Sequence, residues 1–340
     1  MALLLDGSDA SIARAAAQLA RGGLLGLPTE TVYGLAADAN NAAAVASIFS
    51  AKGRPSDHPL IAHIAAPAQR SVDAWREALA PFVQDVPLFA LTLAQAFWPG
   101  PLTLVFRRRP DMCEATAGGL TTLAVRCPAH PLAQRVLQAA QALGVVGVAA
   151  PSANRFGKVS PTTAAHVMDE FANQLSDEAL CVLDGGACQV GIESTIVDCS
   201  RASPVLLRPG MLSVSALSEV LGQTIGGPDA HAPKVSGSLE SHYAPDARVQ
   251  LWPAATLRSA WGALSAAQRA ATAIYAPQSQ AFHGAVCAHD MPVDAQACAH
   301  ELFAVLRALD QPDVRHIWVQ QPPHTADWAG VNDRLQRAAA

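Results

Sequence analysis

The alternation of short apolar runs with helix-like patterns over the first 210 residues is the feature that most constrains the fold of this chain. Several of these runs are apolar almost without interruption, as at 144–150. A strand that is apolar on both sides is typical of a sheet covered by helices on both faces, so we expect an α/β layered domain. The expected strands within 180–208 follow one another without a helix between them, which predicts a mixed sheet.

Two patterns predict the individual elements of this first part. Strands are expected where an apolar run is bounded by turn residues, and helices where apolar residues recur at helical spacing. The expected strands are 23–27, 60–64, 102–106, 121–126, 145–150, 180–183, 194–198 and 204–208. The expected helices are 41–51, 84–97, 130–142 and 162–171, together with one that Ser8 caps and that runs through Arg21.

A change of texture after residue 211 predicts a second domain. A short helix-like piece gives way to a stretch rich in Gly, Pro and Ser without periodicity, which is typical of a linker. Beyond it, strands are expected at 247–252, 271–276, 284–288 and 314–320, and helices at 256–268, 294–309 and 329–338. We therefore expect an N-terminal domain at 1–211, a linker at 212–245 and a smaller α/β, Rossmann-like domain at 246–340.

Composition excludes several classes of protein. Hydrophobic residues make up 51% of the chain and charged residues 15%, which is typical of a globular protein and not of a disordered one. The formal net charge of -5 provides no overall basic field for a nucleic-acid backbone. The only dense basic run, at 107–109, is interpreted as a solvated strand end.

The cysteines and the N-terminus indicate the compartment. The seven cysteines form neither a C-x-x-C pair nor a zinc-finger spacing, which argues against a secreted disulfide scaffold and predicts no metal site. The first six residues lack the basic region of a signal peptide, and no apolar run reaches the length of a membrane span. We expect a cytoplasmic protein without membrane contact.

Polar residues recur where the predicted strands end. Five such ends carry Thr, Ser or Arg: PTETVYG at 28–34, TTLAVR at 121–126, AAPSAN at 149–154, GIEST at 191–195 and LLRPG at 206–210. Ligands often bind at such sheet edges. Each end also has a purely structural interpretation, such as Thr29 capping a helix. Their convergence favours an anionic ligand that carries a carboxylate and phosphates.

The segment 51–63 holds the densest set of candidate phosphate ligands. The chain contains neither a P-loop nor a G-x-G-x-x-G after a strand, so single cations and hydroxyls would have to hold a nucleotide's phosphates. The candidates are Lys52, Arg54, His58 and His63. Two cations beside a helix end are more often solvated, and a lone histidine in an apolar strand is more often a core residue. WPGPLT at 98–103 is interpreted as a structural turn into a strand.

The motifs together resemble those of the YrdC-like threonylcarbamoyl-AMP synthase family. They are, in order, PTETVYGL, AKGRP-x-x-HPL, WPGPLT, LAVRCPAHP, AAPSAN, GIESTIVD and LLRPG. SHYAP at 241–245 and VNDRLQRAA near the C-terminus are similar to the longer, two-domain members. The resemblance implies a mixed, twisted sheet flanked by helices. It also implies synthesis of L-threonylcarbamoyladenylate from L-threonine, bicarbonate and ATP, with release of pyrophosphate, for threonylcarbamoylation of tRNA adenosine 37.

The resemblance also assigns the candidate residues to two substrates. It places L-threonine at Thr31, His63, Arg126, Ala150 and Ser194, and ATP at Arg54, His58, Thr122, Ser152, Ser160 and Arg208. Lys52 is expected close to the phosphates and, with Arg54, to act in catalysis. Mg²⁺ is expected to arrive with ATP. Family members often carry Asn in place of His58, and some carry Lys and Tyr where this chain has Leu239 and Glu240.

Partners and the role of the second domain complete the expectations. The family passes its product to the proteins that modify tRNA, so a tRNA threonylcarbamoyl-transfer complex is the expected partner. One alternative is a YrdC-like RNA-binding module without synthase activity; another is a carbamoyl-transfer enzyme of the hydrogenase-maturation type, whose zinc-finger-like cysteines are missing here. We expect the linker to lie across the cleft, anchored at His242 and Tyr243, with the second domain as a lid. A passive tether is the alternative.

Overall fold

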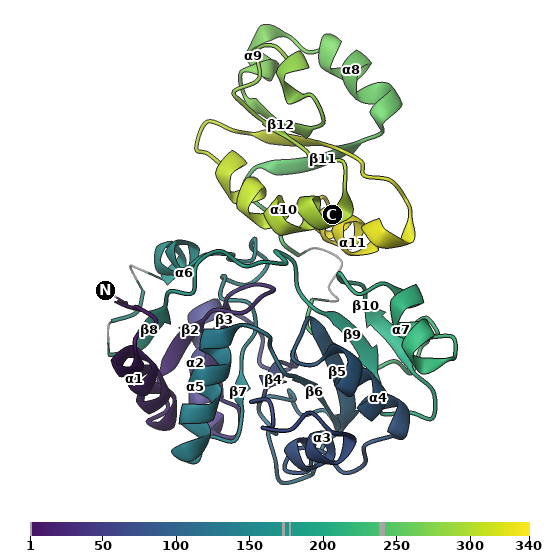
Figure 1. Cartoon of the computed structure of the whole chain (residues 1–340). Helices are drawn as coiled ribbons and strands as arrows, with labels where there is room; N and C mark the ends of the chain where they lie inside the picture. The colour runs from purple at the N-terminus through teal and green to yellow at the C-terminus, as the bar shows by residue number, and fades with distance from the viewer. Residues whose placement is uncertain (1, 172–173, 177, 238–241) are drawn as a thin grey trace.

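The computed structural model describes residues 2–171, 174–176, 178–237 and 242–340. Its strands form two separate sheets, one of ten strands and one of four. Figure 1 shows the larger sheet in the lower domain and the smaller sheet in the upper domain, with two helices of the upper domain facing the lower one. The chain therefore folds as two α/β units in contact with each other.

The larger sheet is mixed, with the order β1-β8-β2-β3-β7-β4-β6-β5-β9-β10. It contains parallel pairs, such as β4 with β6, and antiparallel pairs, such as β5 with β6. The strands are β1 (Leu3–Leu5), β2 (Leu24–Leu27), β3 (Gly34–Asp38), β4 (Ile61–His63), β5 (Leu102–Arg107), β6 (Thr122–Arg126), β7 (Val148–Ala149), β8 (Leu180–Leu183), β9 (Thr195–Asp198) and β10 (Val205–Arg208). The expectation of a mixed sheet is confirmed.

Local sequence signals begin and end the helices of this domain. Asn41 accepts hydrogen bonds from the first turn of α2, and Gly53 ends that helix in the left-handed conformation, at φ 61°, which glycine adopts without steric cost. The helices are α1 (Asp9–Ala20), α2 (Ala42–Lys52), α3 (Val72–Leu79), α4 (Leu88–Phe97), α5 (Pro131–Ala142), α6 (Ala164–Phe171) and α7 (Val214–Leu221). The expected cap at Ser8 is confirmed, since its side chain accepts from the Ser11 amide.

The smaller sheet is parallel throughout, with the order β11-β14-β12-β13. Its strands are β11 (Arg248–Trp252), β12 (Thr272–Ala276), β13 (Cys287–Asp290) and β14 (His316–Gln320). The surrounding helices are α8 (Ala254–Gly262), α9 (Ala266–Arg269), η1 (Ser279–Ala281), α10 (Ala295–Leu309), η2 (Ala326–Trp328) and α11 (Ala329–Ala338). A parallel sheet with helical crossovers agrees with the expected second α/β unit.

The two units share an apolar core. Val32, Val159 and Ile192 of the larger unit belong to the same buried cluster as Leu302 of α10 and Val331 of α11. The segment between the units begins with α7, whose Leu217 is buried in the core of the larger unit. We keep the boundaries at 211 and 246 as a proposal, because a sheet lies complete on each side of them.

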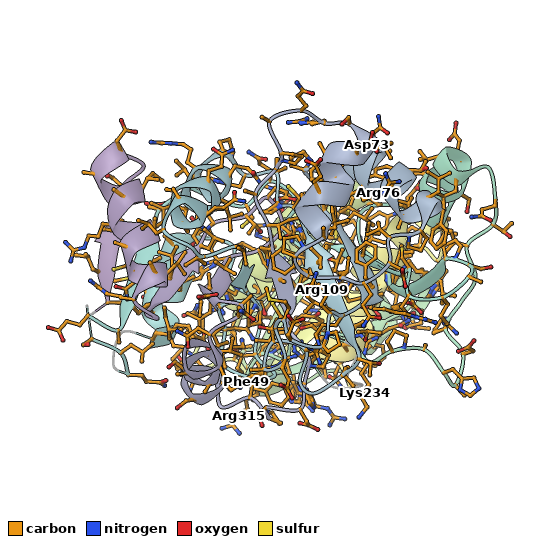
Figure 2. All side chains as sticks on the ribbon, turned by 90° about the horizontal axis from the view of Figure 1, so that it is seen from below. Phe49, Asp73, Arg76, Arg109, Lys234 and Arg315 are labelled. Atoms are coloured by element: carbon orange, nitrogen blue, oxygen red, sulfur yellow. The ribbon has the colours of Figure 1, made fainter. Side chains whose placement is uncertain are left out.

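The basic run at 107–109 lies at the surface of the larger unit. Arg107 and Arg109 are exposed at the end of β5, and the Arg109 side chain pairs with Asp111 at 3.6 Å. Figure 2 shows labelled surface residues, including Arg109 and the Asp73–Arg76 pair, whose side chains lie 2.7 Å apart. Arg107 and Arg109 are solvated as expected, whereas Arg108 is half-buried and its side chain donates to the carbonyls of Leu120, Arg109, Pro110 and Met112. No helix among the described residues combines the length and hydropathy needed to span a bilayer.

Candidate functional site

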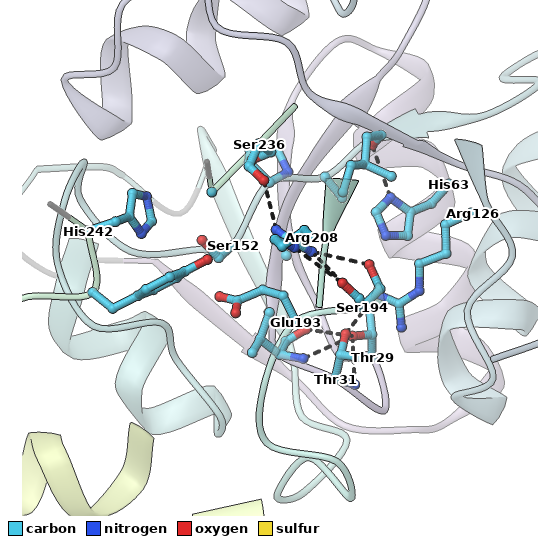
Figure 3. Close-up of a pocket in the computed structure, with 17 residues that line it drawn as sticks. Thr29, Thr31, His63, Arg126, Ser152, Glu193, Ser194, Arg208, Ser236 and His242 are labelled. Carbon is cyan, nitrogen blue, oxygen red and sulfur yellow. Dashed lines mark hydrogen bonds between the residues drawn. The ribbon is translucent and has the colours of Figure 1, made fainter. Parts of the chain in front are cut away.

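A pocket lies where several strands of the larger sheet end and where the linker crosses them (Figure 3). Its wall combines hydroxyls, two arginines, two histidines and one carboxylate with apolar residues. The lining residues are Thr29, Thr31, Val32, Gly34, Ile61, His63, Arg126, Ala150, Pro151, Ser152, Glu193, Ser194, Arg208, Ser236, Gly237, His242 and Tyr243. All five residues expected to hold L-threonine are among them, so the structure brings them together.

Strand register explains why these side chains meet. His63 of β4 and Thr103 of β5 both stand opposite Arg126 of β6, so three polar residues form a row across the sheet. Side chains alternate between faces along a strand, so Thr122 and Ala124 lie on the same face as Arg126. The row at the end of the strands is therefore continuous with a face that runs back toward Thr122.

Arg126 is held by an acidic partner that the sequence analysis did not assign. Its Nη2 lies 2.6 Å from Glu30 Oε1, and both side chains are 4% exposed. Nη1 donates to Thr31 Oγ1 at 2.7 Å, and Nε donates to the Gly100 carbonyl. An arginine in so many contacts has a fixed orientation, which suits recognition of a carboxylate.

His63 is neutral in the folded protein. Its Nδ1 lies 3.1 Å from the Ile61 carbonyl, which can only accept, so Nδ1 carries the proton and Nε2 is left as an acceptor. Burial, reinforced by the nearby Arg126 charge, lowers the pKa of His63 to about 3. The imidazole can therefore accept a hydrogen bond from a hydroxyl or an ammonium group at neutral pH.

This depressed pKa predicts a pH-dependent stability. The unfolded chain binds a proton at His63 below the ordinary pKa of 6.5, whereas the folded chain does so only near 3. The contribution to the unfolding free energy is therefore complete above 6.5 and is lost as the pH falls toward 3. When the pH is lowered from about 7.5 to about 5, we expect the unfolding free energy of wild type to fall by about 2 kcal/mol more than that of His63→Asn.

Denaturant unfolding at the two pH values measures this difference. The matched control is His283→Asn, since His283 is exposed. An identical pH dependence in His63→Asn and wild type would contradict a neutral, buried imidazole.

Ser194 and Arg208 form the next part of the wall. The Ser194 hydroxyl lies 2.7 Å from Thr103 Oγ1, and Arg208 Nη2 donates to the Ser194 carbonyl at 2.8 Å. Arg208 Nη1 donates to the Ser236 carbonyl of the linker at 2.8 Å. The acceptors of these Arg208 bonds are uncharged, so its positive charge is not used up by them.

Glu193 is the only carboxylate in the pocket wall as described. Its Oε1 accepts from Ser160 Oγ at 2.5 Å, and its Oε2 accepts from Arg334 Nε of α11 at 3.0 Å. The pKa of Glu193 is lowered because the Arg334 and Arg208 charges and the Ser160 hydroxyl outweigh the burial that opposes them. Ser160 itself is fully buried and reaches the pocket through this carboxylate.

Arg54 and His58 lie in an adjoining cavity of about 170 Å³. This cavity shares Gly237 and His242 with the first pocket, so the two are neighbours. Among the described residues Arg54 has no acidic partner: Nη2 donates to the Pro59 carbonyl, and the buried Nε has no hydrogen-bond partner. Burial lowers the pKa of Arg54 to about 10. A buried, uncompensated guanidinium is suited to an anion.

The remaining expected ATP residues are placed less directly. Ser152 lines the first pocket, whereas Thr122 lines a separate cavity with Arg107 and Arg108. The Lys52 ammonium is buried and donates to the Ser152 and Asn154 carbonyls. It therefore braces the AAPSAN turn, and its role near phosphates stays a prediction.

The linker fills much of the pocket, as the sequence analysis expected. The wall of the pocket includes four linker residues: Ser236, Gly237, His242 and Tyr243. The space left free is about 30 Å³, which is far less than the several hundred Å³ that a nucleotide-sized ligand needs. The substitutions at Leu239 and Glu240 lie outside the described residues.

Sequence reasoning missed three residues that organise the site. Glu30 and Glu193 stand inside motifs that were singled out, but their arginine partners are distant in sequence. Thr103, in the turn that was interpreted as structural, contacts Ser194 in the wall. A buried arginine needs a counter-charge, and that need was the signal that could have pointed to Glu30.

Family comparisons match both halves of the chain. The family model described as "Telomere recombination" matches residues 17–210, and the one described as "Threonylcarbamoyl-AMP synthase, C-terminal domain" matches residues 212–340. The chain is 34% identical over 352 residues to the threonylcarbamoyl-AMP synthase of Bacillus subtilis, covering 98% of this chain and 94% of the relative. It is 42% identical over 240 residues to that of Pyrococcus abyssi, covering 69% and 66%.

A solved structure matches the whole fold. The crystal structure of Pyrococcus abyssi Sua5 complexed with L-threonine superposes with a TM-score of 0.86 at 33% sequence identity, covering 100% of this chain and 97% of that one. The resemblance inferred from the motifs is confirmed, and the synthase interpretation is supported over that of an RNA-binding module. The chain belongs to the threonylcarbamoyl-AMP synthase family, in its two-domain form, and is an enzyme of that class.

Proposed function

We propose that this chain makes L-threonylcarbamoyladenylate from L-threonine, bicarbonate and ATP and releases pyrophosphate. One observation carries the proposal: all five residues expected at L-threonine line one pocket, next to a cavity that holds Arg54. The Pyrococcus abyssi relative of the same fold is solved with L-threonine. L-Threonine is thus the substrate with the most direct support.

The charges of the site suit the chemistry. The amino nitrogen of L-threonine bonds to the carbon of bicarbonate with loss of water, which gives the carbamate. An oxygen of this N-carboxylate group, not of the α-carboxylate, then attacks the α-phosphorus of ATP, the bond from that phosphorus to the bridging oxygen breaks, and pyrophosphate leaves. Both reactants are anions, so cations that face them lower the barrier. Arg54 has no acidic partner among the described residues, and the hydrogen bonds of Arg208 go to uncharged acceptors. No enzyme nucleophile is required.

Mg²⁺ is proposed to be held by the phosphates of ATP. No group of three or more His, Cys, Asp or Glu side chains gathers as a cation site within the ranges that the structure covers. Glu193, in the pocket wall, already accepts from Ser160 and Arg334. The chain's own residues therefore fit the charged nucleotide better than the bare ion, and the ion would balance charge on the phosphates.

Mass spectrometry of the products tests the proposal. The chain, incubated with ATP, bicarbonate and L-threonine, should yield a threonylcarbamoyl adenylate together with pyrophosphate. Omission of L-threonine or bicarbonate is the control and should abolish the adduct. Salt-dependent tRNA binding without any adduct would instead support the RNA-binding alternative.

The product is a mixed anhydride, so the next step must transfer its threonylcarbamoyl group before water does. We propose delivery to a complex that modifies tRNA adenosine 37, in the cytoplasm. The net charge of -5 supports a hand-off between proteins over direct tRNA binding. Co-purification of the transfer proteins with the tagged chain tests the hand-off.

The linker is proposed to cover the bound adenylate. The pocket is already lined by Ser236, Gly237, His242 and Tyr243 of the linker. The ring centroids of Tyr243 and of Phe303 in α10 lie 5.3 Å apart, so the second domain packs against the linker. We expect ATP plus L-threonine to protect the region 225–240 from limited proteolysis, because a closed cover excludes the protease. The measurement is the cleavage rate with and without both substrates.

A passive tether makes the opposite prediction. Cleavage within 225–240 would then be equally fast with ligands, and a chain shortened to end near Leu212 would keep full activity. Cleavage in the α8–α9 region, at the end of the upper domain that is turned away from the larger sheet (Figure 1), is the internal control and should not respond to substrates.

A further inference from the structure

The C-terminal domain places one buried arginine directly behind the site. Arg334 of α11 is 0% exposed, and its Nε donates to Glu193 Oε2 at 3.0 Å. Its Nη1 donates to the Pro209 carbonyl at 2.7 Å, and its Nη2 donates to the Glu193 carbonyl at 3.2 Å. Every one of these contacts crosses from the second domain to the GIEST and LLRPG motifs of the first.

The C-terminal domain also contacts Ser160, the other hydrogen-bond partner of the Glu193 carboxylate. Arg307 of α10 donates to the Ser160 carbonyl at 3.3 Å and also to the Val159 carbonyl. Both residues of the Ser160–Glu193 hydrogen bond are therefore contacted by arginines of the C-terminal domain: Arg307 at the Ser160 carbonyl and Arg334 at the Glu193 carboxylate. Two independent contacts on one short hydrogen bond indicate that this domain fixes the geometry of the wall.

Close backbone packing makes this grip rigid. A Cβ on Gly330 of α11 would lie 2.8 Å from the Gly210 carbonyl oxygen, and one on Gly191 would lie 2.3 Å from the carbonyl oxygens of Ala299 and His300 in α10. Only glycine allows the two domains to approach so closely at these two points. The Arg334 guanidinium also lies 5.6 Å from the Tyr243 ring centroid, on the linker side.

A charge inventory shows what Arg334 does for an anionic ligand. Arg126 is balanced by Glu30, and Glu193 is balanced by Arg334. Arg208 and Glu193 line the same pocket, but the Arg208 hydrogen bonds go to Ser194 and Ser236. Without Arg334, the Glu193 carboxylate would draw Arg208 toward itself and cancel its charge.

We propose that Arg334 is a positioning residue for the synthase site: it holds the Glu193 carboxylate on Ser160 and leaves the Arg208 charge free for an anionic substrate. The proposal deepens the proposed function, on which the assignment of ATP to Arg208 rests. It gives the C-terminal domain an indirect part in substrate binding, through Glu193 and Arg208. It also explains why a carboxylate can stand in the wall of a pocket that takes anions.

Arg334→Gln tests the proposal, with KM and kcat measured separately for each substrate. We expect KM for ATP to rise about tenfold or more, because a charge-assisted contact is lost and Arg208 is compromised, while KM for L-threonine changes less. The matched control is Arg258→Gln, an exposed arginine on α8 of the same domain whose side chain donates to Gln278. It should stay within about twofold of wild type.

A double-mutant cycle separates positioning from mere support of the fold. If Arg334 acts through the Glu193 carboxylate, Arg334→Gln should cost much less in Glu193→Gln than in wild type. An equal cost in both backgrounds, or a wild-type KM for ATP in a folded Arg334→Gln chain, would overturn the proposal. If Arg334→Gln does not fold, Arg334→Lys replaces it. Its KM for ATP should lie between that of wild type and the about tenfold higher value expected for Arg334→Gln. An unchanged KM there would also overturn it.

A pH profile gives a further independent readout. The charged and titratable groups that interact with Glu193 are Arg208, Arg334, Lys52, His242 and Tyr243, while Asp333 pairs with Arg334. Burial keeps His242 and Tyr243 neutral by moving the pKa of His242 to about 3 and that of Tyr243 to about 12. Loss of Arg334 should raise the pKa of Glu193, so the acid limb of the ATP profile should move to higher pH. An unmoved limb would contradict the proposal.

Calorimetry keeps this result apart from the identity of the reaction. Binding of ATP and of L-threonine to wild type and to Arg334→Gln is measured without turnover. If wild type binds both ligands but forms no adduct, the proposed reaction fails while the comparison of ATP affinities still tests Arg334. Equal ATP affinity of the two folded proteins would overturn the proposal even if wild type is an active synthase.

Discussion

Arg54→Ala should remove most of the synthase activity and leave the fold intact. Arg54 is a nearly buried guanidinium with no acidic partner among the described residues, and its Nε has no hydrogen-bond partner. Such a group is suited to grip phosphates. Its loss should cost about 2–4 kcal/mol of transition-state stabilisation, which is about 30- to 1,000-fold in kcat/KM for ATP.

Stability should not fall with activity. Among the described residues, the Arg54 side chain donates only to the Pro59 carbonyl at 3.2 Å and to Ser236 Oγ at 3.4 Å, so its removal leaves no carboxylate of this part of the structure without a partner. Thermal melting should therefore be close to that of wild type. The control is Arg109→Ala, which removes an exposed arginine paired with an exposed aspartate. Near wild-type turnover of Arg54→Ala at limiting ATP would refute the assignment.

The fold was predictable where the apolar pattern is strong and was missed where it is weak. The run at 144–150 predicted a strand over 145–150, and β7 covers Val148–Ala149 within it. By contrast β3 (Gly34–Asp38) was missed, because Gly and Ala have little preference for strands and this segment is fixed by pairing with β2 and β7. The strand β1 was missed because it has only three residues, and the helix α3 was missed as well.

The site was predictable from polar strand ends, but its internal pairing was not. The order of Thr31, His63 and Arg126 along the chain says nothing about register, which places His63 directly opposite Arg126. The partner of Glu193 lies 141 residues away, in the other domain. Such a pairing depends on how two domains pack, which no local pattern in the sequence encodes.

L-Threonine should be selected over L-valine by about 10⁴-fold in kcat/KM. Over L-serine it should be selected by only about 10- to 200-fold, which corresponds to about 1–3 kcal/mol. Valine has the shape of threonine but lacks the hydroxyl, so it would leave polar groups of the wall without their partner. His63 offers a neutral Nε2 acceptor, and the Thr31 and Ser194 hydroxyls lie in the same wall. Serine lacks only a methyl group, for which the small Ala150 leaves room.

Pyrophosphate release with each amino acid measures this selectivity, and a variant identifies its source. His63→Leu keeps an apolar group of similar size but removes the acceptor, so we expect the gap between threonine and valine to narrow strongly while ATP still binds. Arg109→Ala, far from the wall, should leave the gap unchanged. Equal turnover of valine and threonine by the wild-type chain would show that the hydroxyl is not bound. The wall would then recognise only the carboxylate, through Arg126, and the shape of the side chain.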